Sequence, residues 1–134
     1  MVEIDHLGIA VRSLDEALEF YHEMLGMPLG DREEVAGERV EAALLPAGSA
    51  ADAPRIELLQ ASDDSSPIAR FIEKRGPGLH HIAVRVDDLS STVSRLQARG
   101  ARILNEPQQG AGGHIYVFVH PSATGGVLLE LIQK

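Results

Sequence analysis

The sequence predicts an α+β protein built from two pseudo-symmetric βαβββ modules. The first observation is an internal repeat: "HLGIAVRSLDEA" from His6 matches "HIAVRVDDLSST" from His81, 75 positions later. The second is that residues 37–46 and 112–121 align at the same offset, and both segments end in a proline. Each copy reads as a strand, a helix and then three strands. The repeat therefore covers most of the chain.

The first module is predicted over about residues 1–61. Its first strand covers residues 2–11, where side chains alternate in character. A helix follows, because Ser13 and Glu16 have the spacing of a capping box and Gly26 is typical of a helix end. The module's remaining strands are expected near residues 29–34, 39–46 and 55–60.

A short helix over about residues 66–76 is predicted to link the modules. Ser66 suits its N-cap, Pro67 its first turn and Gly76 its end. The second module is expected over about residues 78–134. Its elements are a strand at 80–87, a helix at 89–99 and strands near 101–105, 113–120 and 127–133.

Composition limits the possible functions. The length of 134 residues suits one domain, and the lack of cysteine excludes disulfides, thiolate nucleophiles and cysteine metal sites. The net charge of −8 argues against a nucleic-acid-binding protein. No apolar stretch approaches membrane-spanning length, and no basic region precedes the N-terminal apolar run. We therefore expect a cytoplasmic protein that binds no membrane.

Two adjacent histidines, His80 and His81, begin the second module. Neighbouring side chains on a strand point to opposite faces, so only one of the two can face a given site. The repeat pairs His81 with His6, and both lie opposite the apolar residues that should pack on helices. We therefore expect His81 to face the site and His80 to lie at the strand edge.

Each module also carries a glutamate in its last strand, Glu57 in "RIELLQ" and Glu130 in "VLLELIQ". Burying a carboxylate is costly unless it is paired or coordinated. Taken singly, a strand histidine is more often structural and a strand glutamate more often solvated. Their repetition favours a shared role: with His6 and His81 the glutamates form an N2O2 set. Such a set suits one octahedral divalent metal with two open positions.

Three other polar residues lie close to these candidates in the sequence. Gln60 and Gln133 fall on the strand faces opposite the two glutamates, so we do not expect them to bind metal. Glu41, in "RVEAALLP", points with Arg39 and Ala43 and has two interpretations. It is either a surface carboxylate paired with Arg39 or a general base that faces the metal.

These features resemble the vicinal oxygen chelate superfamily, in which paired βαβββ modules form a half-open barrel around a metal site. Longer stretches, among them "SPIARFIEKRGPGLHHIAVRVDDL" and "GGVLLELIQ", are similar to the methylmalonyl-CoA epimerase family. The resemblance spans nearly the whole chain and implies a single domain over residues 1–134.

The resemblance implies an isomerase that interconverts (R)- and (S)-methylmalonyl-CoA by moving the α-proton through a metal-stabilised enolate. It implies His6, Glu57, His81 and Glu130 as metal ligands, with Glu41 and Glu130 as the catalytic bases. The expected cofactor is Co²⁺, with Mn²⁺, Ni²⁺ or Zn²⁺ as alternatives, and the expected partners are an acyl-CoA substrate and a second copy in a homodimer. Two other functions stay open: a glyoxalase I-type lyase that acts on a glutathione hemithioacetal, and a non-catalytic binding protein of the same fold.

Overall fold

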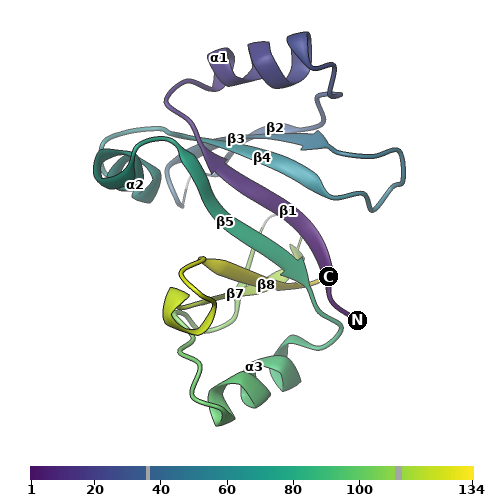
Figure 1. Ribbon diagram of the computed structural model, residues 1–134, viewed down its shortest axis with the longest axis vertical. Coiled ribbons are helices and arrows are strands. Elements are labelled where there is room, and N and C mark those ends of the chain that lie inside the picture. The colour runs from purple at the N-terminus through teal and green to yellow at the C-terminus, as the bar shows by residue number, and fades with distance from the viewer. Residues whose placement is uncertain (36, 111–112) are drawn as a thin grey trace. The chain divides into compact units, whose positions relative to one another are not determined.

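A computed structural model describes residues 1–35, 37–110 and 113–134 (Figure 1). The chain divides into two compact units, one of residues His6–His80 and one of Met1–Asp5 with His81–Lys134. The first five residues belong to the second unit because Asp5 forms ion pairs with Arg85 and Lys134 there. None of the described helices is long and apolar enough to cross a membrane.

The His6–His80 unit contains a sheet with the strand order β2-β3-β4-β1. Strand β4 is parallel to β1 and antiparallel to β3, which in turn is antiparallel to β2. The elements are β1 (Glu3–Ala10), α1 (Leu14–Leu18), β2 (Arg32–Val35), β3 (Val40–Pro46), β4 (Arg55–Ala61) and α2 (Pro67–Arg75).

Helices cover both faces of this sheet. On one face, Leu14 and Leu18 of α1 pack against the alternate residues Ala43, Leu45 and Leu58. On the other face, α2 packs against a second cluster, because the intervening side chains of the same strands point that way. This second cluster consists of Ala10, Val40, Ala42, Leu59 and Ile68.

The second unit repeats the pattern with the strand order β5-β8-β7-β6. Strand β8 is parallel to β5 and antiparallel to β7. Helix α3 covers one face, where its residues Leu89, Val93 and Leu96 pack with Val117 and Leu131. The elements are β5 (Gly78–Arg85), α3 (Leu89–Ala98), β6 (Gln108–Gln109), β7 (Ile115–Val119), a 3₁₀ turn (Pro121–Ala123) and β8 (Leu129–Gln133).

The structure confirms the α+β class and the order strand, helix, three strands in both modules. One predicted strand, 101–105, is wrong: only Ile103 forms a bridge, with Val119, and the first strand after α3 lies at Gln108–Gln109. The reason is Asn105, whose side-chain oxygen accepts a hydrogen bond from the Phe118 N–H at 2.7 Å. A side chain thus takes the place of a backbone partner at this edge of β7.

The first predicted helix changes geometry halfway along its length. It begins at Leu14 after the predicted Ser13 cap, but Glu19–Met24 form a π-helix instead of continuing the α-helix. Phe20 and Met24 remain exposed on this segment. Capping and glycine signals therefore located the ends of the helix and not its internal geometry.

Candidate functional site

His6 and Glu57 form a close pair in the His6–His80 unit. They lie on the neighbouring parallel strands β1 and β4, where Gly8 is the register partner of Glu57. The distance from His6 Nε2 to Glu57 Oε1 is 3.5 Å, and the two side chains are 8% and 19% exposed. Two side chains that alternation predicts to share a face therefore do so, and both are largely removed from solvent.

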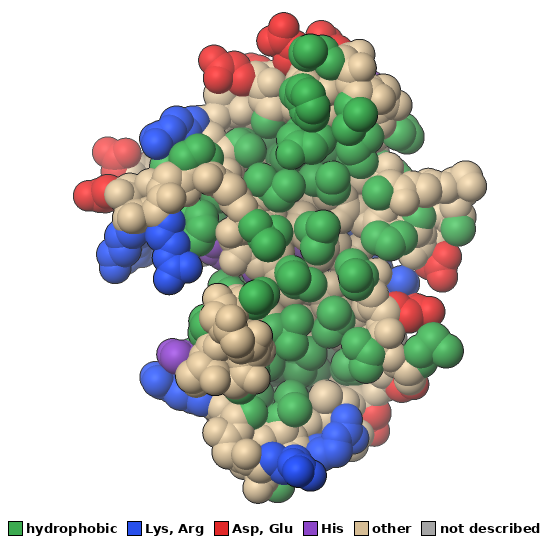
Figure 2. Space-filling view, in the orientation of Figure 1, with side chains coloured by type: hydrophobic (Ala, Val, Ile, Leu, Met, Phe, Trp, Pro, Cys, Tyr) green, Lys and Arg blue, Asp and Glu red, His purple; other side chains and the backbone are tan. Residues whose placement is uncertain are grey.

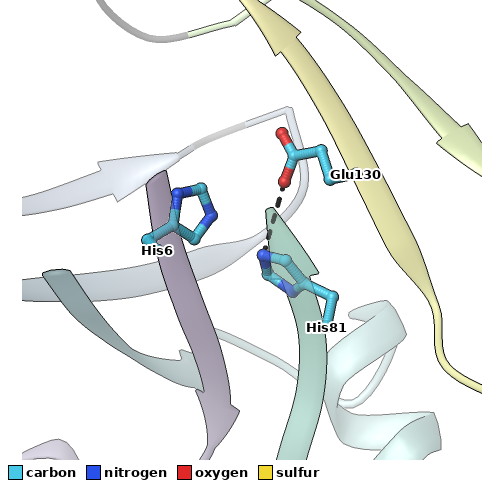
Figure 3. Close-up of side chains that lie close together, drawn as sticks. All are labelled: His6, His81 and Glu130. Carbon is cyan, nitrogen blue, oxygen red and sulfur yellow. Dashed lines mark ion pairs between the residues drawn. The ribbon is translucent and has the colours of Figure 1, made fainter. Parts of the chain in front are cut away.

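His81 and Glu130 form the equivalent pair in the second unit. They lie on the parallel strands β5 and β8, where Ala83 is the register partner of Glu130. His81 Nε2 lies 3.4 Å from Glu130 Oε1, and the side chains are 6% and 10% exposed (Figure 3). The ring of Phe118, the β7 register partner of Glu130, stands edge-on to His81 with centroids 6.0 Å apart. Aromatic packing thus holds the imidazole of this pair.

Both pairs have the spacing of two ligands on one metal ion. Ligand atoms about 2.1 Å from an ion and at right angles to each other are about 3 Å apart. The nitrogen-to-oxygen distances of 3.5 and 3.4 Å are close to this spacing. A neutral imidazole and a carboxylate are ligands that Co²⁺, Mn²⁺, Ni²⁺ and Zn²⁺ accept. Each unit therefore offers half of the donor set that the repeat predicts.

The glutamines next to the two glutamates have a different role, as expected. Gln60 Oε1 accepts a hydrogen bond from the Leu14 backbone N–H at 2.6 Å, and Gln133 does the same for Leu89 at 2.6 Å. Leu14 and Leu89 are the first residues of α1 and α3, so each glutamine satisfies a helix N-terminus. The ligand face and the capping face of each last strand are thus separate.

The structure does not bring Glu41 to the face of the His6–Glu57 pair. In the β3–β4 register Glu41 opposes Gln60, whereas Leu44 opposes Glu57. The pleat therefore points Glu41 to the α1 side of the sheet, where its carboxylate is 42% exposed and lies 3.5 Å from Arg32. Glu41 thus has an ion-pair partner, and that partner is Arg32 instead of the predicted Arg39.

Arg39 lies elsewhere because its backbone has a positive φ of 55°. Its guanidinium donates a hydrogen bond to Ser65 Oγ at 2.6 Å. The left-handed conformation directs this side chain toward the start of α2 and away from the course of strand β3.

His80 does not share the orientation of His81. Its ring packs edge-on against Phe71 of α2, with centroids 4.9 Å apart. Alternation along the strand predicts this separation of neighbouring histidines. The opening residues of β5 therefore supply one imidazole that packs on a helix and one that pairs with a carboxylate.

Asp5 is a polar residue that sequence reasoning did not single out. Its side chain is 3% exposed, and Oδ1 lies 2.9 Å from Lys134 Nζ and 3.6 Å from Arg85 Nε. A carboxylate within an apolar run, directly before a candidate ligand, is the signal that could have identified it. Its buried position fixes the start of β1 next to His6.

Comparison with known proteins assigns the family. Residues 5–118 match the Glyoxalase/Bleomycin resistance protein/Dioxygenase superfamily. The mitochondrial methylmalonyl-CoA epimerase of Bos taurus is 35% identical over 132 residues, which cover 97% of this chain and 73% of that protein.

Two solved structures are also similar. Methylmalonyl-CoA epimerase from Mycobacterium tuberculosis has 41% identity and a TM-score of 0.88, and the match covers 98% of this chain and 87% of that one. A Streptomyces coelicolor methylmalonyl-CoA epimerase variant in complex with 2-nitronate-propionyl-CoA has 32% identity and a TM-score of 0.89, covering 98% and 96%. The chain therefore belongs to the Glyoxalase/Bleomycin resistance protein/Dioxygenase superfamily.

Proposed function

We propose that this protein is a metal-dependent epimerase that interconverts (R)- and (S)-methylmalonyl-CoA. The observation that carries the proposal is the pair of buried histidine–glutamate contacts, His6–Glu57 and His81–Glu130, at repeat-equivalent positions. The similarity to methylmalonyl-CoA epimerases supports the substrate. The proposal also includes a homodimer, on the family resemblance.

The proposed metal site uses both pairs. His6, His81 and Glu130 offer three ligand atoms that could hold a metal ion together, and Glu57 adds a fourth through its contact with His6. Two carboxylates balance the charge of a divalent ion, and two imidazoles favour Co²⁺ over the hard ions Mg²⁺ and Ca²⁺.

The proposed reaction removes the proton between a thioester and a carboxylate and returns it from the opposite side. A bound divalent cation would act as a Lewis acid toward the substrate's oxygen atoms. Glu130 would take or return the proton on one side, because it is the carboxylate held among His81 and Phe118 in a site that excludes most water. The edge-on ring of Phe118 keeps the imidazole of His81 in place during this step.

Glu41 is retained as the second base on the family resemblance alone. The sheet geometry counts against it, because the pleat directs its carboxylate toward Arg32 on the α1 side. For Glu41 to act as a base, the substrate would have to reach its carboxylate at the sheet edge that β2 and β3 form. Its role is therefore the part of the proposal that a single substitution tests most sharply.

Interconversion of the two epimers tests the proposed function. We expect the Co²⁺-loaded protein to convert pure (S)-methylmalonyl-CoA to a mixture of about equal parts of both epimers, and removal of metal by a chelator to stop the conversion. A protein that leaves the (S)-epimer unchanged but consumes methylglyoxal with glutathione is instead a lyase. A protein that does neither, yet binds acyl-CoA, is a binding protein of this fold.

A further inference from the structure

Helix α2 lies on the face of the sheet that carries the His6–Glu57 pair. Its residue Ile68 packs against Ala10 and Leu59. Ala10 shares a strand face with His6, and Leu59 shares one with Glu57, because both are separated by an even number of residues. Helix α1 packs on the opposite face. Among the described helices of the His6–His80 unit, α2 is thus the one on the sheet face of the His6–Glu57 pair.

Positive charge is concentrated on this helix although the whole chain has a net charge of −8. Arg70, Lys74 and Arg75 are exposed, and Figure 2 shows Lys and Arg side chains gathered around α2. Arg70 and Lys74 are four residues apart, so they share a helix face and repel each other. The helix dipole favours cations in the last turn, which covers Lys74 and Arg75 but leaves Arg70 in mid-helix.

The cations at the two ends of α2 differ in their surroundings. Near the start of the helix, Arg39 and Arg70 both donate to Ser65. Hydrogen bonds from Ser65, with the nearby charge of Arg39, lower the pKa of Asp63, which therefore stays ionised beside that arginine. The start of α2 already has its counter-charge.

The last turn of α2 contains one carboxylate, that of the exposed Glu73, which is not ion-paired with the neighbouring cations. In the described part of the chain, neither Lys74 nor Arg75 forms an ion pair. Arg75 lies over the ring of Phe71, 5.9 Å from its centroid, and Phe71 in turn packs against His80. A guanidinium over an aromatic ring is held in place with its donors still available.

Helix α3 provides an internal comparison. It carries Arg95, its C-cap is Arg99 and Arg102 follows shortly after, and all three are exposed. However, α3 packs against Val84 and Leu131, which lie on the strand faces opposite His81 and Glu130. The charges of α3 therefore lie on the sheet face opposite His81 and Glu130. Both helices carry positive charge, and they differ in which sheet face they cover.

We propose that Lys74 and Arg75 form the site for the phosphate groups of the acyl-CoA substrate. This inference rests on the proposed function, because it takes the ligand to be a coenzyme A thioester. Coenzyme A carries several phosphate charges at the end remote from its thioester, and a chain of charge −8 repels them unless cations lie nearby. Arginine donors arranged in a fork bind phosphate oxygens by charge-assisted hydrogen bonds.

Steady-state kinetics with two thioesters test this site. The double variant Lys74→Gln, Arg75→Gln is compared with the matched variant Arg95→Gln, Arg99→Gln, which removes the same charge from α3 and its C-cap. With methylmalonyl-CoA we expect the α2 variant to raise KM about tenfold or more, with kcat and metal content unchanged. With the methylmalonyl thioester of N-acetylcysteamine, which has no phosphate, we expect its kinetics to equal those of the unaltered protein.

A readout that needs no turnover separates this inference from the proposed function. Calorimetry with adenosine 3′,5′-bisphosphate, a fragment of coenzyme A, should detect binding to the unaltered protein and to the α3 variant and none to the α2 variant. Fragment binding without epimerisation would overturn the proposed function and leave the phosphate site standing. Normal KM and fragment affinity in a folded α2 variant would overturn the phosphate site, as would an equal loss with both thioesters.

Discussion

His81 Nε2 lies 3.4 Å from Glu130 Oε1, whereas the neighbouring His80 packs against Phe71. The two histidines therefore differ in role although they are adjacent. We expect His81→Ala to lose the bound metal and His80→Ala to keep it, because His81 belongs with Glu130 to the candidate ligand set, whereas His80 packs on α2. Metal content by mass spectrometry after loading with Co²⁺ and desalting measures both. Loss of metal from the His80 variant alone would overturn the assignment of strand faces.

We expect Glu57 to contribute to metal affinity more through its ligand oxygen than through its negative charge. Glu57→Gln keeps a carbonyl oxygen near His6 Nε2, so this variant should still bind metal, with affinity lowered by about tenfold. Glu57→Leu removes the oxygen and should lower the affinity much further. Titration with Co²⁺, followed by its absorption, gives both constants. Equal affinities for the Leu variant and the unaltered protein would exclude Glu57 as a ligand.

Glu41 is tested by removing its charge and, separately, its partner. If Glu41 is the second base, Glu41→Gln should lower kcat by about a hundredfold or more with metal content unchanged. Arg32→Gln breaks the same 3.5 Å ion pair and leaves the carboxylate, so it should retain most activity. A small and equal effect of both substitutions would mean that Glu41 serves only the surface pair on the α1 side.

Asp5 should contribute to stability rather than to chemistry. Its buried carboxylate is the common partner of Lys134 and Arg85, so Asp5→Asn removes this counter-charge from both, although Arg85 keeps its ion pair with Glu3. We expect the free energy of unfolding to fall by about 2 kcal/mol. Lys134→Gln removes a half-exposed partner and should cost less than about 1 kcal/mol. Urea denaturation compares the two variants, and an unchanged midpoint for Asp5→Asn would contradict the structural role.

The two capping glutamines should have similar stability effects. Gln60 and Gln133 each satisfy the first backbone N–H of a helix. Their replacement by Ala should cost about 1 kcal/mol each, and the costs should add because the two sites share no partner. Thermal unfolding of the single and double variants measures this. A negligible effect at one site would show that the two glutamines do not contribute equally to the free energy of unfolding.

These caps also explain why the fold could be predicted from the sequence. The repeat places a serine or aspartate cap, a leucine and a glutamine at matching positions, and the structure uses Ser13 and Asp88 as the caps of α1 and α3. Alternation on single strands also assigned His81 and His80 to different faces. Such predictions depend only on local geometry, and local geometry is what a single sequence encodes most directly.

The features that prediction missed depend on long-range partners. The side chain of Asn105 replaces a ladder contact of Phe118, thirteen residues away, and nothing in its local sequence predicts this. The partner of Glu41 is Arg32 because the β2–β3 pairing aligns the two on one face, whereas spacing alone favoured Arg39. The π-helix after Leu18 likewise follows no local signal.

Exchange of the substrate's α-proton tests the central claim most directly. The Co²⁺-loaded protein is incubated with methylmalonyl-CoA in D₂O, and the α-proton is followed by NMR, with the His81→Ala and His80→Ala variants in parallel. We predict rapid deuterium uptake for the unaltered protein and the His80 variant, and uptake at the uncatalysed rate for the His81 variant. Uptake that is equally fast without metal, or with the His81 variant, would contradict an epimerase that depends on the two histidine–glutamate pairs.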